Sequence, residues 1–306
     1  MENRLQGVCP ILPTAFHNDG KLDIASIRRE VDFLLRAGVD GIALFGNASE
    51  AFALTGAEKK QIAEMVTEEN SGRVPLVFGA GGTAAEPAIE SSLWAAEQGA
   101  EVLMIMPPHM MKPDVPRIYE FYARIAESVD IPIMIQDAPN ACGVNIPVDT
   151  IVQLSRDYAN IQYVKAEAPP TFQKAKKIIQ AAGDRLTVFG GLNATFFFEE
   201  LCVGVQGTMP AGEFPDVLVK VWQLFRQGEK DKAREIFYHY LPFIRLGSIP
   251  GGMAMAVHKE ILKRGGIFDT NQVRAPFIQA DDTLIELVME SLEGRELLAL
   301  SGRGEN

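Results

Sequence analysis

Short apolar stretches alternate with longer amphipathic stretches along most of this chain of 306 residues. The apolar stretches have the length of strands and are rich in β-branched side chains, whereas the stretches between them repeat apolar residues at helical spacing. The predicted strands cover residues 8–14, 40–46, 75–81, 101–108, 131–139, 161–167, 186–191 and 205–210. Each is followed by a predicted helix, over about residues 23–38, 57–69, 84–98, 115–128, 147–156, 172–182, 195–202 and 215–227.

This alternation of strand and helix determines the expected fold class. Eight such units in succession favour an α/β protein whose parallel strands close into a (β/α)8 TIM barrel, which we assign to residues 1–228. An open doubly wound sheet is the alternative. However, no G-x-G-x-x-G follows the first strand, and the glycine cluster at 79–85 follows the third strand with a different spacing.

The pattern changes after residue 228, where helices follow one another without strands. Predicted helices at 230–244, 252–264 and 280–297 form a C-terminal helical appendage, residues 229–306, which we expect to pack on the barrel. The last residues, 301–306, are expected to fray.

Polar side chains stand where several predicted strands end, and in this fold the reactive groups gather at the C-terminal ends of strands. Lys165 and Glu167 end the sixth strand, and because strand residues two apart share a face, both should point the same way. The other polar residues at strand ends are Asn47, Ser49 and Glu50 after the second strand, His109 after the fourth, Gln136 and Asp137 at the end of the fifth, and Asn193 after the seventh. We expect them to meet at one mouth of the barrel.

A lysine at the end of a buried strand is the most informative of these residues. Burial lowers the pKa of a lysine, and a neutral amine is a nucleophile that forms a Schiff base with a carbonyl. The resulting iminium acidifies the neighbouring carbon and so permits aldol cleavage, aldol addition or loss of water. Glu167 is placed to move that proton or to hold the amine charged. The alternative from spacing alone is an exposed ion pair at a strand end.

The order of six motifs resembles the dihydrodipicolinate synthase/N-acetylneuraminate lyase family over residues 5–300. These motifs are "GVCPILPTAF", "GIALFGNASEAFALTGAEK", "MPPHMMKP", "IPIMIQDAPNACG", "YVKAE" and "GVQGTMPAG". The resemblance implies a (β/α)8 barrel that acts on pyruvate or another 2-keto acid through a covalent imine on Lys165, without a further cofactor. Such enzymes are commonly tetrameric, so we expect a homo-oligomer, either a dimer or a tetramer.

Five positions depart from the pattern of the synthase and lyase branches. Gln136 stands where a proton-relaying tyrosine ends strand five, and Ala48 replaces a threonine of the loop after strand two. Pro108 and His109 replace tyrosines after strand four, and Ala141 replaces the arginine that binds a substrate carboxylate. Because an amide side chain does not titrate, Gln136 cannot act as an acid or base. We therefore expect dihydrodipicolinate synthase activity to be absent or poor.

The motifs Asn-x-Ser-Glu, Met-Pro-Pro, Gln-Asp-Ala-Pro and Lys-x-Glu together resemble the 2-keto-3-deoxy sugar-acid dehydratase branch, such as 2-keto-3-deoxyarabonate dehydratase. That resemblance implies that Glu167 is the acid–base group in place of the missing tyrosine. The expected reaction is dehydration of a 2-keto-3-deoxy sugar acid. A pyruvate-dependent aldolase, a dihydrodipicolinate synthase and a ligand-binding barrel without activity are the alternatives.

The remaining candidate residues are expected to bind substrate or support the site. The expected substrate-binding residues are Asn47, Ala48, Ser49, His109, Gln136, Gly191 and Asn193. Ser49 is either a hydrogen-bond donor to the substrate carboxylate or a cap, and Asn193 either binds substrate or caps the following helix. His109 either orients a sugar hydroxyl or is solvated. We expect structural roles for Glu50, through bonds to buried loop amides, and for Asp137, which should point to the opposite face from Gln136.

Composition narrows the possible partners. Lys and Arg number 29 against 40 Asp and Glu, and a net charge of −11 repels phosphate backbones, so we expect no nucleic-acid partner. The three cysteines have no zinc-like spacing and are expected to be reduced thiols, and the four histidines are too scattered to suggest a metal site. The N-terminal stretch lacks a signal-like apolar core, and no apolar run approaches the ~18 residues of a membrane span. We expect a cytoplasmic protein with no membrane partner.

Overall fold

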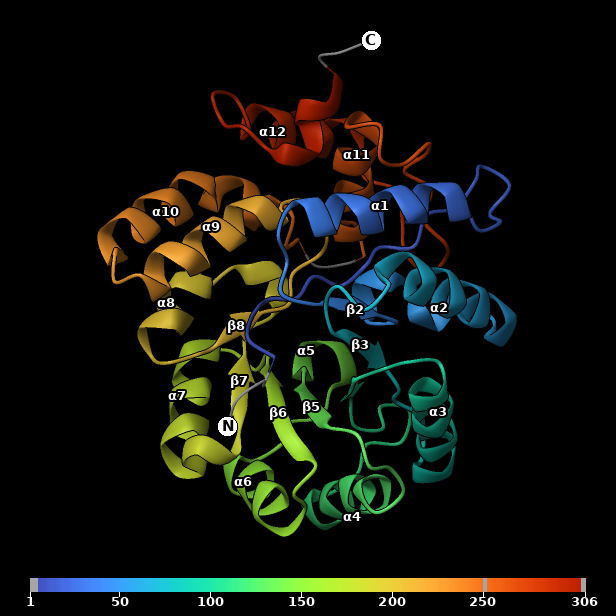
Figure 1. Ribbon diagram of the computed structural model, residues 1–306, viewed down its shortest axis with the longest axis vertical. Helices are drawn as coiled ribbons and strands as arrows, with labels where there is room; N and C mark the ends of the chain where they lie inside the picture. The colour runs from blue at the N-terminus through green and yellow to red at the C-terminus, as the bar shows by residue number, and fades with distance from the viewer. Residues whose placement is uncertain (1–4, 250–251, 304–306) are drawn as a thin grey trace.

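Parallel pairing joins the strands of the chain into a closed barrel (Figure 1). The computed structural model describes residues 5–249 and 252–303. Its strands are β1 (Gly7–Val8), β2 (Ile42–Leu44), β3 (Leu76–Gly79), β4 (Val102–Ile105), β5 (Ile133–Asp137), β6 (Ile161–Ala166), β7 (Thr187–Phe189) and β8 (Gly207–Thr208). Strands β2 to β7 pair in sequence order, β1 pairs with β8, and single bridges from Ile11 to Ala43 and from Gly190 to Thr208 close the circle. The predicted (β/α)8 barrel is confirmed.

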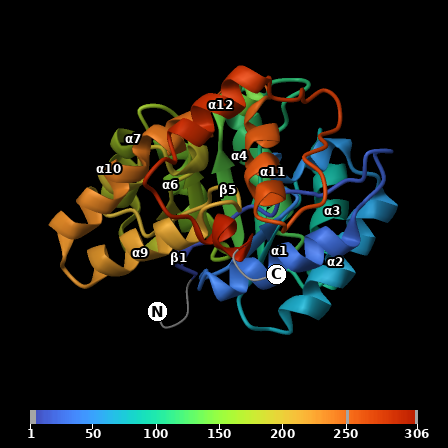
Figure 2. The same ribbon diagram turned by 90° about the horizontal axis from the view of Figure 1, so that it is seen from above.

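A helix follows each strand and covers the outside of the barrel, as the view from above shows (Figure 2). These helices are α1 (Ile24–Arg36), α2 (Gly56–Asn70), α3 (Ala85–Glu97), α4 (Val115–Ala126), α6 (Val148–Asp157), α7 (Thr171–Ala182), α8 (Phe197–Cys202) and α9 (Pro215–Arg226). Asp23 caps α1 by accepting a hydrogen bond from the Ser26 amide at 3.0 Å. The sequence did not reveal the one-turn helix α5 (Pro139–Cys142) that follows β5.

The first strand is much shorter than predicted. The apolar stretch 8–14 contains Pro10 and Pro13, which have no backbone N–H to donate to a neighbouring strand, and β1 ends at Val8. Ile11 still reaches both neighbours through isolated bridges to Ala43 and Ala211. The barrel therefore closes through scattered hydrogen bonds rather than through a long first strand.

The protein has two apolar cores, one inside the barrel and one between the barrel strands and the surrounding helices. The inner core contains Cys9, Ala43, Val77, Met104, Met134, Tyr163, Phe189 and Met209 among its buried residues. The larger outer core lies between the strands and the helices. Because side chains alternate along a strand, Tyr163 on the inner face of β6 places Lys165 on that face as well. The lysine therefore stands at the top of a packed apolar floor.

The helices after the barrel are α10 (Lys230–Leu246), α11 (Ala254–Arg264) and α12 (Asp282–Glu290). Helix α10 packs against α9, and α11 packs against α12 at the end of the molecule beyond α1 (Figure 1). The helix predicted over 280–297 ends at Glu290, before Gly294 with a φ of +69°. Of the tail expected to fray, residues 301–303 belong to a final 3-10 turn, and residues 304–306 lie outside the described part of the chain.

Candidate active site

Lys165 and Glu167 lie side by side at the C-terminal end of β6. Lys165 Nζ is 3.5 Å from Glu167 Oε1, and the two side chains are only 6% and 10% exposed. In the pairing of β5 with β6, Lys165 stands directly opposite Gln136. The alternative of an exposed ion pair at a strand end is therefore wrong, because both charges are buried on the inner face of the barrel.

The carboxylate of Glu167 is fixed by its surroundings. Gln136 Nε2 donates to Oε2 at 3.0 Å, and the backbone amide of Leu192 donates to Oε1 at 3.2 Å. Gly191 presses against the same side chain, since a Cβ at this position would lie 2.4 Å from Glu167 Oε1 and 2.5 Å from its Cγ. Gln136 therefore positions the carboxylate, and Gly191 leaves the space that it occupies.

A small pocket of about 120 Å³ opens above this pair. Its lining combines strand-end residues with two residues of α11: Ile11, Asn47, Ala48, Lys165, Glu167, Asn193, Met209, Pro210, Ala211, Met255 and His258. Five of the nine residues predicted as catalytic or substrate-binding line this one pocket, namely Asn47, Ala48, Lys165, Glu167 and Asn193.

Asn193 belongs to an unusual turn after β7. Leu192, Asn193 and Ala194 have φ values of 47°, 51° and 60°, a left-handed conformation that costs non-glycine residues free energy. The Asn193 side chain accepts from the Ala211 amide at 3.0 Å and donates to the Gly247 carbonyl at 3.3 Å. It does not cap α8, whose N-cap is Phe196, so the capping alternative is wrong. Asn193 instead ties the loops after β7 and β8 to the end of α10.

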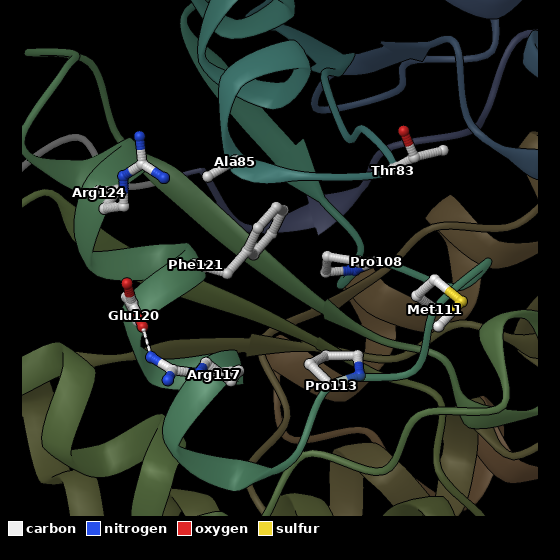
Figure 3. A pocket seen from close by; sticks show the side chains of 9 residues that line it. All are labelled: Thr83, Ala85, Pro108, Met111, Pro113, Arg117, Glu120, Phe121 and Arg124. Atoms are coloured by element: carbon white, nitrogen blue, oxygen red, sulfur yellow. Dashed lines mark hydrogen bonds and ion pairs between the residues drawn. The ribbon is translucent and has the colours of Figure 1, made fainter.

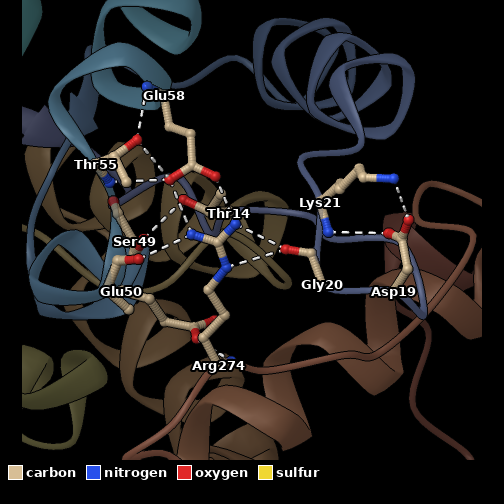
Figure 4. A network of polar contacts seen from close by, with 10 residues as sticks. Thr14, Asp19, Gly20, Lys21, Ser49, Glu50, Thr55, Glu58 and Arg274 are labelled. Atoms are coloured by element: carbon tan, nitrogen blue, oxygen red, sulfur yellow. Dashed lines mark hydrogen bonds and ion pairs between the residues drawn. The ribbon is translucent and has the colours of Figure 1, made fainter.

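The loop after β2 is held by the C-terminal part of the chain (Figure 4). Glu50, with a φ of 54°, accepts from the backbone amide of Arg274 at 2.7 Å and from the ammonium of Lys259. Arg274 also binds Glu58 through two hydrogen bonds of 2.5 and 2.9 Å. The structural role expected for Glu50 is confirmed, with an ammonium as an additional partner.

Ser49 lies in the same loop, in a short 3-10 turn formed by Asn47–Ser49. Its carbonyl accepts from Thr14 Oγ1 at 2.7 Å, whereas its own hydroxyl is buried and has no hydrogen-bond partner in residues 5–249 and 252–303. The capping alternative is therefore wrong. A buried hydroxyl without a partner is costly, and the role of Ser49 as a donor to substrate stays a prediction.

Asp137 and His109 lie away from the pocket. Asp137 pairs with Lys174 Nζ at 2.6 Å on the outer side of the barrel, as expected from strand alternation. His109 is exposed and lines a neighbouring pocket of about 260 Å³, which Asn47 and Gln136 also line. The orientation of a sugar hydroxyl by His109 stays a prediction.

A second buried carboxyl group lies behind the end of β7. Glu200 accepts from Thr171 Oγ1 at 2.6 Å, and burial, its largest effect, raises the Glu200 pKa to about 8. Glu167 contributes to that rise through its charge. Burial likewise raises the pKa of the Cys9 thiol at the barrel floor, so it remains protonated near Lys165. A protonated thiol is a poor nucleophile, and the nucleophilic role of Lys165 stays a prediction.

His258 is the titratable residue of the pocket that the sequence did not reveal. It lies on α11, more than 90 residues after Lys165, and its Nδ1 is 2.6 Å from Glu213 Oε1. The sequence did contain one signal that His258 is buried. His258 shares the i, i+3, i+4, i+7 spacing of an apolar helix face with Ala254, Val257 and Ile261. A histidine on such a face is buried, and a buried imidazole requires a hydrogen-bond partner.

Two other cavities define the surroundings of the pocket. An apolar cavity of about 700 Å³ shares Asn193, Met255 and His258 with it. A further cavity of about 320 Å³ lies against α4, where Arg117 pairs with Glu120 and Pro108 and Met111 face the opening (Figure 3). That cavity shares no lining residue with the pocket of Lys165. In the part of the chain that the structure describes, no cluster of His, Cys, Asp or Glu could hold a metal ion, and no helix is long and apolar enough to cross a membrane.

Comparisons with known proteins agree with this geometry. Residues 4–294 match the Dihydrodipicolinate synthetase family. The chain is 33% identical over 290 residues to an L-2-keto-3-deoxyarabonate dehydratase of Azospirillum brasilense, and this similarity covers 93% of each of the two chains. It is 30% identical over 245 residues to a 4-hydroxy-tetrahydrodipicolinate synthase of Methanopyrus kandleri, covering 79% of this chain and 81% of the relative.

Solved structures share the fold over nearly the whole chain. The dihydrodipicolinate synthase of Thermotoga maritima superposes with a TM-score of 0.90 at 24% identity, covering 95% of this chain and 99% of the other. The dihydrodipicolinate synthase of Rhodopseudomonas palustris gives a TM-score of 0.87 at 28% identity, with 94% and 97% covered.

Proposed function

Since the chain belongs to the dihydrodipicolinate synthetase family, we propose that it is a Schiff-base lyase that removes water from a 2-keto-3-deoxy sugar acid, with 2-keto-3-deoxyarabonate as the first substrate to test. One observation carries the proposal. A buried carboxylate, Glu167, lies beside the buried amine of Lys165, and Gln136, which cannot titrate, holds it there. The relative from Azospirillum brasilense, similar over 93% of both chains, supports the choice of substrate class.

The proposed reaction begins at Lys165. Its amine adds to the C2 carbonyl of the 2-keto acid, and loss of water leaves an iminium on Nζ. Glu167 then takes a proton from C3. The C–H electron pair forms the C2=C3 bond of an enamine, and the iminium nitrogen regains its lone pair. A carboxylate 3.5 Å from the nitrogen is close enough to reach the carbon next to the imine carbon.

Loss of the C4 hydroxyl completes the dehydration. The nitrogen lone pair restores the iminium, the C2=C3 electrons form a C3=C4 bond, and the C4–O bond breaks as the oxygen takes up a proton and leaves as water. Asn47 and Ala48, which line the pocket, hold the substrate carboxylate in this proposal together with the adjacent Ser49, whose buried hydroxyl has no hydrogen-bond partner in the described residues. Gly191 and Asn193 shape the side of the pocket after β7.

The imine on Lys165 is the covalent link, and we propose that no further cofactor is needed. We also propose that the protein is a cytoplasmic homo-oligomer, a dimer or a tetramer, without a nucleic-acid partner. The family similarity supports an oligomer, and the net charge of −11 is unfavourable for binding a phosphate backbone.

The test combines trapping with product analysis. The protein is incubated with pyruvate or 2-keto-3-deoxyarabonate and borohydride, and peptide mass mapping should locate a reduced adduct on the peptide that contains Lys165. In a separate incubation with 2-keto-3-deoxyarabonate and without borohydride, NMR of the products should show a 2-keto semialdehyde and no pyruvate. No adduct with any 2-keto acid would defeat the Schiff-base proposal, and pyruvate as the main product would show an aldolase.

A further inference from the structure

Helix α11 brings a second titratable group to the pocket. His258 is 1% exposed at its side chain, lines the pocket together with Lys165 and Glu167, and lies at the junction with the apolar cavity of about 700 Å³. In residues 5–249 and 252–303 its hydrogen bond is made by Nδ1, to Glu213 Oε1 at 2.6 Å. A carboxylate on one ring nitrogen fixes the orientation of the imidazole, and the other nitrogen, Nε2, is then the one for a ligand.

The carboxyl group of Glu213 is itself completely buried. In the described residues, Glu213 Oε2 has no hydrogen-bond partner. Both carboxyl oxygens of Glu30, a group that interacts electrostatically with Glu213, also lack a hydrogen-bond partner there. Burial raises the Glu30 pKa well above its usual value, while the charge of Lys259 lowers it by a smaller amount. Burying the pair of His258 and Glu213 costs desolvation free energy.

A second acid–base group would leave Glu167 free to keep the C3 proton and return it to C3 at the end of the reaction, while the other group protonates the hydroxyl that leaves C4. Formation of a semialdehyde also requires removal of a proton from C5. We propose that His258, oriented by Glu213, is a second catalytic acid–base residue, which protonates the leaving C4 hydroxyl and then accepts the C5 proton. The inference rests on the proposed function.

The steps balance without an external oxidant. Protonated His258 gives its proton to the C4 oxygen, which leaves as water while C3=C4 forms. Neutral His258 then takes a proton from C5. The C5–H electrons form C4=C5, and the C3=C4 electrons move to C2=C3, which restores the enamine. Glu167 returns its proton to C3, and the enol becomes an aldehyde as a proton moves from the C5 oxygen to C4. C5 is oxidised from an alcohol, C4 is reduced by the same two electrons, and hydrolysis frees Lys165.

The position of His258 agrees with the length of the substrate. The carboxylate and C2 are held between the loop after β2 and Lys165, so C4 and C5 must extend away from them within a pocket of about 120 Å³. His258 and Met255, from α11, are the lining residues that do not come from the strand ends. The far end of the acid therefore meets α11.

The decisive variant is His258→Gln, with His239→Gln as its matched control, because His239 is exposed on α10 and lies outside the pocket. We expect His258→Gln to trap pyruvate on Lys165 and to exchange the pyruvate methyl protons in D2O as the wild type does. Its turnover of 2-keto-3-deoxyarabonate should fall about 10²–10⁴-fold, the usual cost of losing an acid–base group. Wild-type turnover in His258→Gln would overturn the inference and leave the proposed function intact.

A substrate with a better leaving group separates catalysis from structure. When fluoride replaces the C4 hydroxyl, departure needs less proton donation, so the deficit of His258→Gln in fluoride release should be at least about tenfold smaller than its deficit with the hydroxyl substrate. Equal deficits would overturn the acid role. Glu213→Gln, which keeps the side-chain volume, provides a second variant and should show the same pattern with a smaller loss. If the wild type itself traps no 2-keto acid, the proposed function fails first.

Discussion

Replacing Gly191 with alanine tests whether the position of the Glu167 carboxylate controls the reaction. A Cβ at residue 191 would lie 2.4, 2.5 and 2.6 Å from Glu167 Oε1, Cγ and Cδ. Ordinary contacts begin near about 3.4 Å, so the carboxylate must move by roughly 1 Å. That displacement would also break its hydrogen bonds from Gln136 and from the Leu192 amide. A 1 Å misplacement of a catalytic group can cost about 10²-fold in rate, which equals about 2.7 kcal/mol of transition-state stabilisation.

The expected phenotype of Gly191→Ala is a separation of two activities. Borohydride should still trap pyruvate on Lys165, whereas exchange of the pyruvate methyl protons and dehydration of 2-keto-3-deoxyarabonate should both slow about 100-fold. Gly56→Ala is the matched control, because a Cβ there meets nothing within 4 Å. Thermal unfolding of both variants would show whether the fold is kept. Wild-type exchange and turnover in a folded Gly191→Ala would refute the role given to Glu167.

Three further predictions follow from the same residues. Glu167→Gln should still form the trapped adduct but lose about 10²–10⁴-fold in turnover; unchanged turnover would remove Glu167 from the mechanism. A coupled assay with pyruvate and aspartate semialdehyde should show negligible synthase activity, because Gln136, Ala48 and Ala141 lack the functional groups of that branch; about one turnover per second or more would contradict this. The Glu200 pKa is raised to about 8, so the folded state binds one more proton than the unfolded state between about pH 5 and pH 8, and stability falls as pH rises through that window. Glu200→Gln should remove up to about 1.4 kcal/mol per pH unit of that slope in urea unfolding, and an unchanged slope would show that Glu200 ionises normally.

Residues on regular strands were the predictable part of the site. The two-residue period of β6 placed Lys165 and Glu167 on one face, and the same rule placed Asp137 on the face opposite Gln136. Most helix boundaries came within a few residues, because caps such as Asp23 have a local sequence signal, although the helix predicted over 280–297 ends at Glu290. The division of the chain at residue 228 and the roles of the candidate residues stay predictions.

Contacts between distant segments could not be predicted. The hydrogen bond from Gln136 to Glu167 depends on two side-chain rotamers, and the left-handed turn at Leu192–Ala194 contains no glycine to signal it. His258 enters the pocket only because α11 folds back over the barrel mouth. Its position on an apolar helix face predicted burial, yet no local pattern indicates which cavity a buried histidine will reach.

The attachment of the C-terminal helices to the barrel mouth bears on how substrate preference can evolve. Lys259 and Arg274 bind the loop after β2, and His258 and Met255 line the pocket itself. A chimera in which only residues 229–306 come from a relative would therefore have new pocket residues around the far end of the proposed substrate. It would keep β6, the strand that carries Lys165. Libraries for directed evolution should accordingly vary α11 together with the loop that it holds, since replacing either Lys259 of α11 or Glu50 of the loop alone breaks the ion pair between them.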